Sequence, residues 1–164
     1  GKYNLPNALA AATVGHYFGV TDSDVTEAIG QYEPTNGRSQ IVQTRRNRLV
    51  VDAYNANPTS MGAALDNFAG HEAGHKCVIL GAMRELGPLQ DEQHAKVLEK
   101  LKTMGLDQAI LIGPEFRKFE KDYPSFSFFN ATPDAEQAVR ALSGKYILIK
   151  GSNSNKLSQL VPLL

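Results

Sequence analysis

From residue 39 onward, short apolar runs alternate with segments that repeat apolar residues at helical spacing. The runs at 76–80 and 108–112 have the length and β-branched content of strands covered on both faces. Between them, residues of about 90–104 repeat apolar positions three and four apart, as an amphipathic helix does. Strands that alternate with helices join through right-handed crossovers into a mainly parallel sheet. The sequence therefore predicts an α/β fold, a mainly parallel sheet flanked by helices.

The same patterns give the expected elements. We expect strands at 39–44, 47–52, 76–80, 108–112, 126–129 and 146–149. We expect helices at 5–18, from Thr21 or Asp22, from Pro58, at about 90–104, at 114–121, after Thr132-Pro133 and around 157–161. Asn4 and Gly19 should cap and end the first helix, and Pro162 should end the last one. The segment Glu-Pro-Thr-Asn-Gly at 33–37 interrupts the pattern as a linker does, which predicts a boundary between 1–35 and 36–164.

Composition excludes several classes of protein. Seventeen basic residues balance seventeen acidic ones, so no net charge attracts nucleic acid or an anionic membrane. No apolar run approaches the roughly 20 residues that span a bilayer, so membrane insertion is not expected. The single cysteine, Cys77, stands in an apolar run, which favours a reduced, buried thiol in a cytoplasmic protein.

A strand that ends at Asp52 is followed by a polar loop and a new helix. Asn57 and Pro58 fit the N-cap and first position of that helix. In an open parallel sheet, the loops that follow the strands emerge at one edge, where ligands bind. Three polar loops are therefore expected to face one another around a small charged ligand: 52–57, 81–87 and 150–156.

Single residues in these loops have more than one interpretation. Asp52 could bind a ribose hydroxyl or cap the next turn. Lys150 could hold a phosphate, although an ordinary solvated lysine is the favoured interpretation. His94 is more typical of a half-buried helix residue than of a general base. Arg38 follows the linker and could reach into a cleft between domains.

One motif points to metal chemistry. His71 and His75 with Glu72 match H-E-x-x-H, in which both histidines must lie on one helical face to bind zinc. Gly70 and Gly74 interrupt this stretch, and a strand follows directly. We therefore expect a helix-to-strand connection and no zinc site.

Five segments resemble successive motifs of the Mur ligase family, in the same order. They are GKYNLPNALAA at 1–11, GR at 37–38, DAYNANPTSM at 52–61, LGAMRELG at 80–87 and KGS at 150–152. The resemblance covers essentially the whole chain. Within the family, the DAYNANP loop favours the ligase that joins D-Ala-D-Ala to UDP-N-acetylmuramoyl tripeptide over its sister enzymes.

The resemblance implies a fragment of a three-domain enzyme of peptidoglycan synthesis. Residues 1–35 would be the last two helices of a central P-loop ATPase domain, and 36–164 the complete C-terminal Rossmann-like domain. In the family, Mg-ATP phosphorylates the carboxylate of the UDP-muramoyl peptide, and the amine of D-Ala-D-Ala attacks the acyl phosphate. The chain contains no G-x-x-x-x-G-K-[ST] phosphate loop. We therefore expect the P-loop, the Mg ligands and the catalytic residues in upstream domains, and a fragment that is inactive alone.

The resemblance also implies which residues complete the nucleotide site. Asn4 and Asn7 would lie on the adenine side, Arg38 near the nucleotide and Asp52 at the ribose, with Tyr54, Asn55 and Asn57 facing the nucleotide and the amine.

Three positions depart from the family pattern and receive no role. Tyr3 replaces the histidine of G-x-H-N, Ala82 the aspartate of G-D-M, and Asn153 an arginine after K-G-S.

Two other functions remain as alternatives to the D-Ala-D-Ala ligase. The chain could be a domain of another Mur-type or folylpolyglutamate-type ligase, or a non-catalytic flavodoxin-like binding module.

Overall fold

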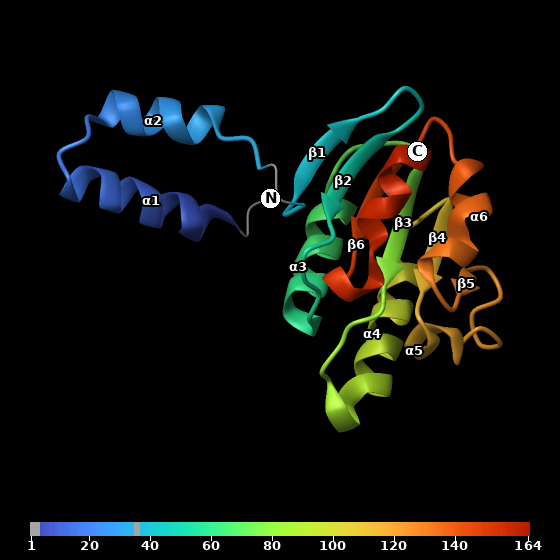
Figure 1. Ribbon diagram of the computed structural model, residues 1–164. Coiled ribbons are helices and arrows are strands. Elements are labelled where there is room, and N and C mark those ends of the chain that lie inside the picture. The colour runs from blue at the N-terminus through green and yellow to red at the C-terminus, as the bar shows by residue number, and fades with distance from the viewer. Residues whose placement is uncertain (1–3, 35–36) are drawn as a thin grey trace. The chain divides into compact units, whose positions relative to one another are not determined.

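The computed structural model describes residues 4–34 and 37–164 (Figure 1). The chain divides into two compact units, Gly1–Thr35 and Asn36–Leu164. Tyr3 and the middle of the expected linker, Thr35 and Asn36, lie outside the described residues. No helix of the described ranges combines the length and the apolar content needed to cross a bilayer.

The first unit is a helix pair, α1 (Leu5–Tyr17) and α2 (Asp22–Gln31). Gly19 follows α1 with a left-handed φ of 78°, and the Thr21 side chain accepts a hydrogen bond from the first turn of α2, as predicted. The predicted cap at Asn4 is wrong. Its backbone is already helical, and its Oδ1 instead accepts a hydrogen bond from Nδ2 of Asn7 at 3.4 Å.

The helix pair has no core of its own. None of its described residues is buried. Its large apolar side chains are exposed: Leu5, Leu9, Val14, Tyr17, Phe18, Val20, Ile29 and Tyr32. Two helices cannot cover each other's apolar stripes completely, so these side chains require a further layer.

The second unit is built on a six-stranded sheet of order β1-β2-β6-β3-β4-β5 (Figure 1). The strands are β1 (Gln40–Gln43), β2 (Arg48–Asp52), β3 (Lys76–Gly81), β4 (Gln108–Ile112), β5 (Ser127–Phe129) and β6 (Tyr146–Lys150). β1 and β2 form an antiparallel hairpin, and all the other neighbours are parallel. The predicted mainly parallel sheet is confirmed. Because β6 lies between β2 and β3, their following loops meet at one edge.

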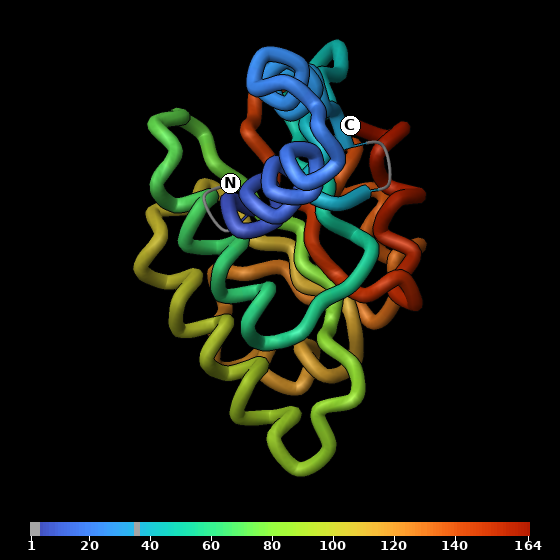
Figure 2. Tube along the Cα trace, turned by 90° about the vertical axis from the view of Figure 1, so that its left-hand side faces the viewer, coloured from blue at the N-terminus to red at the C-terminus, as the bar shows by residue number. Residues whose placement is uncertain are grey.

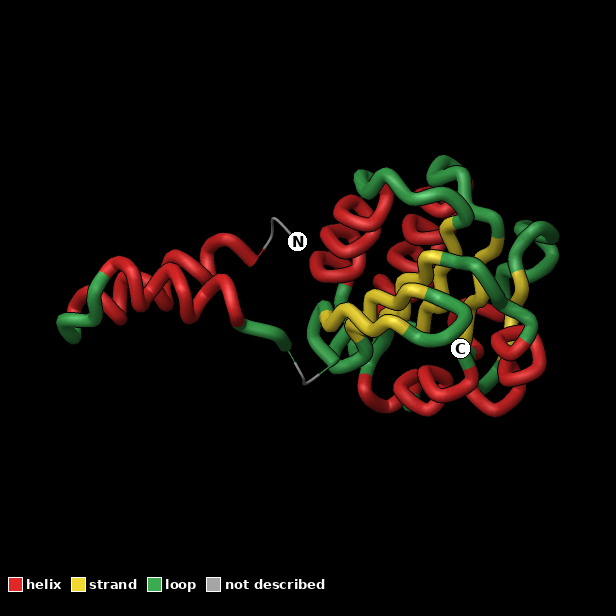
Figure 3. Tube along the Cα trace, turned by 90° about the horizontal axis from the view of Figure 1, so that it is seen from above, coloured by secondary structure: helices red, strands yellow, loops and turns green. Residues whose placement is uncertain are grey.

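Helices cover both faces of this sheet (Figure 3). They are α3 (Pro58–Ala69), α4 (Gln90–Lys102), α5 (Pro114–Arg117) and α6 (Glu136–Arg140). α3 and α4 run alongside each other (Figure 2) and share one core with Val78 and Leu80 of β3. The opposite face of β3, with Cys77 and Ile79, packs against α6 and the last segment of the chain. Both faces of β3 are thus buried, as its continuous apolar run predicted.

Three of the expected helices differ from the prediction. α5 ends at Arg117 instead of extending to 121, and the helix after Thr132 begins as a 3-10 turn and becomes α-helical only at Glu136. The last segment, Leu157–Leu163, is a 3-10 helix that contains Pro162 instead of ending there. Its apolar spacing fits either helix type, because Leu157 and Leu160 are three positions apart and both are buried.

Candidate functional site

The loop after β2 is anchored to the start of α3 by reciprocal capping. Asn57 Oδ1 accepts a hydrogen bond from Ser60 N at 2.8 Å, and Ser60 Oγ accepts one from Asn57 N at 3.1 Å. Pro58 occupies the first helical position, where no backbone N–H is required. The predicted N-cap is confirmed, and it fixes the polar loop 52–57 between a strand end and a helix N-terminus.

A buried ion pair holds the other side of this loop. Lys150 is only 1% exposed, and its Nζ lies 2.6 Å from Oδ2 of Asp52 and 3.2 Å from the carbonyl oxygen of Asn55. The register of β2 and β6 places Asp52 and Lys150 directly opposite each other. The favoured interpretation of Lys150 as a solvated lysine is therefore wrong, because a buried ammonium group requires the partners that this register supplies.

Asp52 retains capacity for a ligand despite this pair. Its Oδ1 also accepts a hydrogen bond from Ser39 N at 3.3 Å, and its side chain is 15% exposed. A carboxylate has about four lone-pair sites, of which these contacts use two. Asp52 is thus held in a fixed orientation with acceptor positions left over.

Tyr54 and Arg38 stack at the same edge. The Arg38 guanidinium carbon lies 4.1 Å from the centroid of the Tyr54 ring, which is half exposed. The carbonyl oxygen of Tyr54 accepts a hydrogen bond from Asn153 N at 3.2 Å. Four of the predicted site residues, including Asp52 and Asn55, are therefore brought together in this unit. Asn57 adjoins them at the start of α3.

The loops after β3 and β6 pack closely enough to require glycine. A Cβ on Gly81 would lie 2.7 Å from Cγ of Asn155, and one on Gly151 would lie 3.1 Å from Cα of Gly81. These contacts and those of Lys150 confirm that loops 52–57, 81–87 and 150–156 face one another. Asn4 and Asn7, the two remaining predicted site residues, belong to the other compact unit.

Sequence reasoning missed the unpartnered buried atoms at this edge. Among the described residues, the buried side-chain atoms without a hydrogen-bond partner are Glu115 Oε2, Ser152 Oγ and Asn155 Oδ1. All three follow the carboxyl ends of β4 or β6. Buried polar atoms are normally paired, so water or a ligand at this edge would supply the partners that these three atoms lack. Only the order of the strands reveals that Glu115, after β4, lies at the same edge of the sheet as Ser152 and Asn155, after β6.

The histidine motif lacks the helical geometry that H-E-x-x-H zinc binding requires. Residues 71–75 are irregular, and His75 has a left-handed φ of 58°, so the expected connection between helix and strand is confirmed. Nδ1 of His75 lies 2.9 Å from Oδ2 of Asp107. Across the described ranges, no group of three or more His, Cys, Asp or Glu residues is arranged to hold a metal ion.

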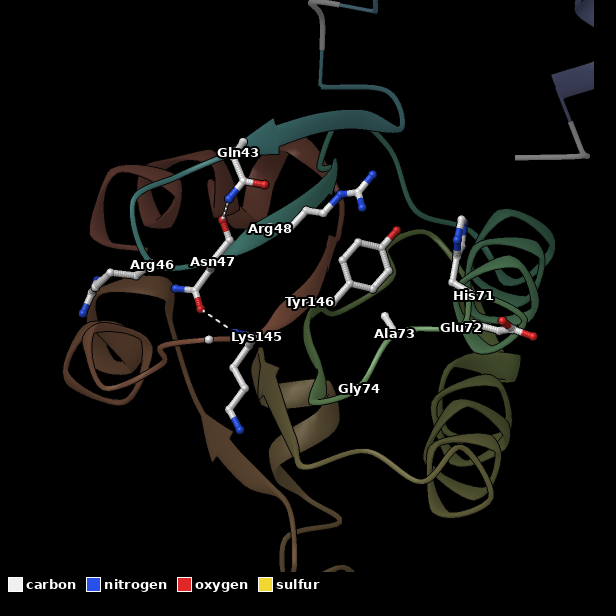
Figure 4. A pocket seen from close by; sticks show the side chains of 11 residues that line it. Gln43, Arg46, Asn47, Arg48, His71, Glu72, Ala73, Gly74, Lys145 and Tyr146 are labelled. Atoms are coloured by element: carbon white, nitrogen blue, oxygen red, sulfur yellow. Dashed lines mark hydrogen bonds between the residues drawn. The ribbon is translucent and has the colours of Figure 1, made fainter.

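One hollow lies at the opposite, amino edge of the sheet. It has a volume of about 330 Å³ and is lined by residues at the starts of β2 and β6. Figure 4 shows Tyr146 between Arg48 and His71, with Lys145 directed away from them. This hollow therefore does not coincide with the polar rim, the open surface that loops 52–57, 81–87 and 150–156 form at the carboxyl edge of the sheet.

Comparison with known proteins gives concordant results. Residues 37–153 match the family model described as Mur ligase, glutamate ligase domain. The UDP-N-acetylmuramoyl-tripeptide–D-alanyl-D-alanine ligase of Bacillus subtilis is 34% identical over 98% of this chain, and that of Escherichia coli is 28% identical over 100%. The chain spans 37% of the length of each.

Solved structures share the fold. A crystal structure of MurF from Acinetobacter baumannii superposes with a TM-score of 0.87 at 24% identity, covering 99% of this chain and 37% of that one. The Thermotoga maritima MurF ligase in complex with ADP gives a TM-score of 0.73 at 21% identity, covering 92% of this chain and 35% of that one. The α/β architecture inferred from the sequence is thus the one found in these proteins.

Proposed function

The chain belongs to the Mur ligase family, and from that premise we propose that it is the C-terminal part of an ATP-dependent ligase of peptidoglycan synthesis. The reaction would join D-Ala-D-Ala to UDP-N-acetylmuramoyl tripeptide, the activity named for the relatives that match nearly the whole chain. The observation that carries the proposal is the rim at the carboxyl edge, where buried Lys150 fixes Asp52 and the carbonyl of Asn55 beside a capped helix N-terminus.

The two compact units support the assignment of the chain to two domains of a longer parent protein. We assign 1–35 to the end of a central ATPase domain and 36–164 to the C-terminal domain. The exposed apolar side chains of α1 and α2 fit this assignment, because upstream residues of the same domain would cover them. The P-loop, the Mg ligands and the catalytic groups would also lie upstream, so the 164 residues alone would be inactive.

The described residues fit one side of an ATP site. Asp52 has free acceptor positions for ribose hydroxyls, and the Arg38–Tyr54 stack offers a planar, cationic surface beside it. Asn55 and Asn57 are exposed on the same loop. For Asn4 and Asn7 we propose contacts to the adenine, as the family resemblance implies. The phosphates and Mg would be held by the upstream domain, since the described residues offer no acidic cluster for a metal.

The reaction would proceed through an acyl phosphate on the tripeptide, which the free amine of the dipeptide attacks. This chain would contribute the binding surfaces, and closure of its rim over the central domain would exclude water from the reactive phosphate. We place the parent in the cytoplasm, where Cys77, buried at 1% exposure, would stay reduced.

A panel of amines offered to the full-length parent tests the proposal. With ATP and UDP-N-acetylmuramoyl tripeptide, we expect ligation of D-Ala-D-Ala and little ligation of single amino acids such as D-glutamate, L-lysine or L-glutamate. Preference for a single amino acid would instead indicate another Mur-type or a folylpolyglutamate-type ligase. Absence of ATP turnover with every amine of the panel would favour the non-catalytic binding module.

A further inference from the structure

The loop 82–87 has an unusual backbone for its composition. Glu85 has a left-handed φ of 62°, and Gly87, two positions later, has a φ of 52°. Glycine adopts this conformation freely, whereas a glutamate there is strained. Strained residues persist where the surrounding structure over-determines them, and they cluster at functional sites. This loop follows β3, in which Leu80 lies opposite Lys150 of β6 and Gly81 packs against Asn155.

Two helices hold the loop in this shape. The backbone N–H of Met83 donates to Nε2 of His94 on α4 at 3.1 Å, and Nη1 of Arg84 lies 2.7 Å from Oε1 of Glu115 on α5. Met83 and His94 are both 0% exposed. The first contact is therefore shielded from water, and its loss would leave a buried N–H without a partner.

The contacts of His94 define its tautomer. Nδ1 lies 2.7 Å from the carbonyl oxygen of Gln90, which can only accept, so Nδ1 carries the proton. Nε2 faces the N–H of Met83, which can only donate, so Nε2 must be unprotonated. The Phe116 ring packs edge-on against the imidazole, with ring centroids 4.6 Å apart, and fixes its plane.

We propose that His94 is a positioning residue of the ligase site, which keeps the rim loop 82–87 in its strained shape through Met83 while Nε2 is unprotonated. The inference rests on the proposed function for its catalytic consequence, but the bond itself does not depend on that function. Protonation of Nε2 would direct two N–H groups at each other and release the loop from α4.

The surroundings of His94 favour the neutral form. Burial lowers its pKa, against the smaller raising effects of the Gln90 carbonyl and of nearby carboxylates. The charged groups that face it are Glu115 and Lys118 on the α5 side, Asp91 in the first turn of α4, and Arg84 in the loop, which pairs with Glu115. Lys118 and Asp91 form an ion pair, so these charges largely balance. The bond is thus present near neutral pH and lost as pH falls through the lowered pKa.

Nuclear magnetic resonance of the ¹⁵N-labelled 164-residue chain tests the bond directly. We expect the His94 ring to show the Nδ1–H tautomer and to titrate below the usual 6.5. The amide resonance of Met83 should move with the same midpoint. An Nε2–H tautomer, or a Met83 amide that does not respond when His94 titrates, would refute the assignment.

Kinetics of the full-length parent test the consequence. His94→Gln places an acceptor near the position of Nε2 and cannot titrate, whereas His94→Leu has no acceptor. We expect the leucine variant to lose about tenfold to a hundredfold in kcat/KM for the amine substrate, the scale of a buried N–H left unpaired, with KM for ATP changed less than twofold. The glutamine variant should stay within about threefold of wild type and lack the acidic limb that His94 contributes to the pH profile.

His75→Gln serves as the matched control, because His75 lies at the other edge of the sheet against Asp107. It should match wild type in all these parameters. If the leucine variant lowers only the melting temperature and leaves kcat/KM intact, His94 is merely structural and the inference is wrong. A wild-type parent without any ligation would overturn the proposed function and this inference together, whereas the resonance experiment would still report on the bond.

Discussion

Lys150 and Asp52 are 98 residues apart in sequence, yet Nζ of one lies 2.6 Å from Oδ2 of the other at the carboxyl edge of the sheet. The lysine also donates to the carbonyl oxygen of Asn55, so one buried ammonium group orients both the acid and the loop that follows it. A charge buried at 1% exposure is tolerated only with such partners. The stability of the domain and the orientation of its proposed nucleotide-binding residues therefore depend on the same ion pair.

Removing one partner of this pair should destabilise the domain. Lys150→Met leaves the Asp52 carboxylate without its cation, and Asp52→Ala leaves a buried ammonium group unpaired. Since breaking a buried pair costs about 3 to 5 kcal/mol, we expect each single variant to lower the free energy of unfolding by roughly that amount, less for Lys150→Met because Asp52 is partly exposed. The Lys150→Met, Asp52→Ala double variant should be less damaging than the sum of the two. Urea denaturation of the four proteins measures this, and strict additivity would show that the pair is not coupled.

The close contact between the loops after β3 and β6 makes a second prediction. Gly151→Ala would place a Cβ 2.7 Å from Cδ1 of Leu157 and 3.1 Å from Cα of Gly81. We expect a loss of about 1 to 3 kcal/mol, typical of overpacking. Gly62→Ala is the control, because nothing lies within 4 Å of a Cβ there and alanine is favoured inside α3. That variant should be stabilised by roughly 0.5 to 1 kcal/mol. Equal melting temperatures for the two variants would contradict the packing account.

The reciprocal cap of α3 gives a third prediction. Asn57→Ala removes the acceptor for Ser60 N and should cost about 0.5 to 2 kcal/mol in thermal unfolding. Asn57→Asp, which keeps an acceptor at the same place, should retain most of the stability. If alanine and aspartate were equally destabilising, the cap would not be the source of the effect.

The pKa of Tyr123, a residue outside the rim loops, gives a fourth prediction. Its hydroxyl donates to Oε1 of Glu99 at 2.6 Å, and this bond, with burial, raises the pKa of Tyr123 to about 12. A raised pKa means that the folded state holds its proton longer than the unfolded state, in which tyrosine titrates near 10. Stability from this group is therefore complete below about pH 10 and lost between about 10 and 12. Ultraviolet titration should show a tyrosine that ionises near pH 12, and Glu99→Gln should shift that ionisation to lower pH. An unchanged titration would rule out this hydrogen bond.

The elements of the fold were predictable because their signals are local. Strand and helix periodicities and the Asn57-Pro58 cap are readable within a few residues, and they correctly place the six strands and the helices α3 and α4 of the second unit. The same signals gave the wrong extent for α5 and the wrong helix type for the last segment. The burial of Lys150 was not predictable, since it depends on the register of β6 against β2. The bond from Met83 to His94 and the pairing of Arg84 with Glu115 depend likewise on how helices pack on the sheet. Residue types thus indicated the rim, and tertiary pairing decided what each residue does there.

The most direct test of the proposed nucleotide side is the ATP dependence of ligation by the full-length parent and its Asp52→Ala variant. Losing a hydrogen bond that involves a charged group costs about 1 to 3 kcal/mol, so we expect kcat/KM for ATP to fall by roughly fivefold to 150-fold. Glu72→Ala, which removes an exposed acid at the opposite, amino edge of the sheet, should behave as wild type. Melting curves must show that the Asp52 variant remains folded at the assay temperature. An unchanged KM and kcat for ATP in the folded Asp52 variant would contradict the central claim.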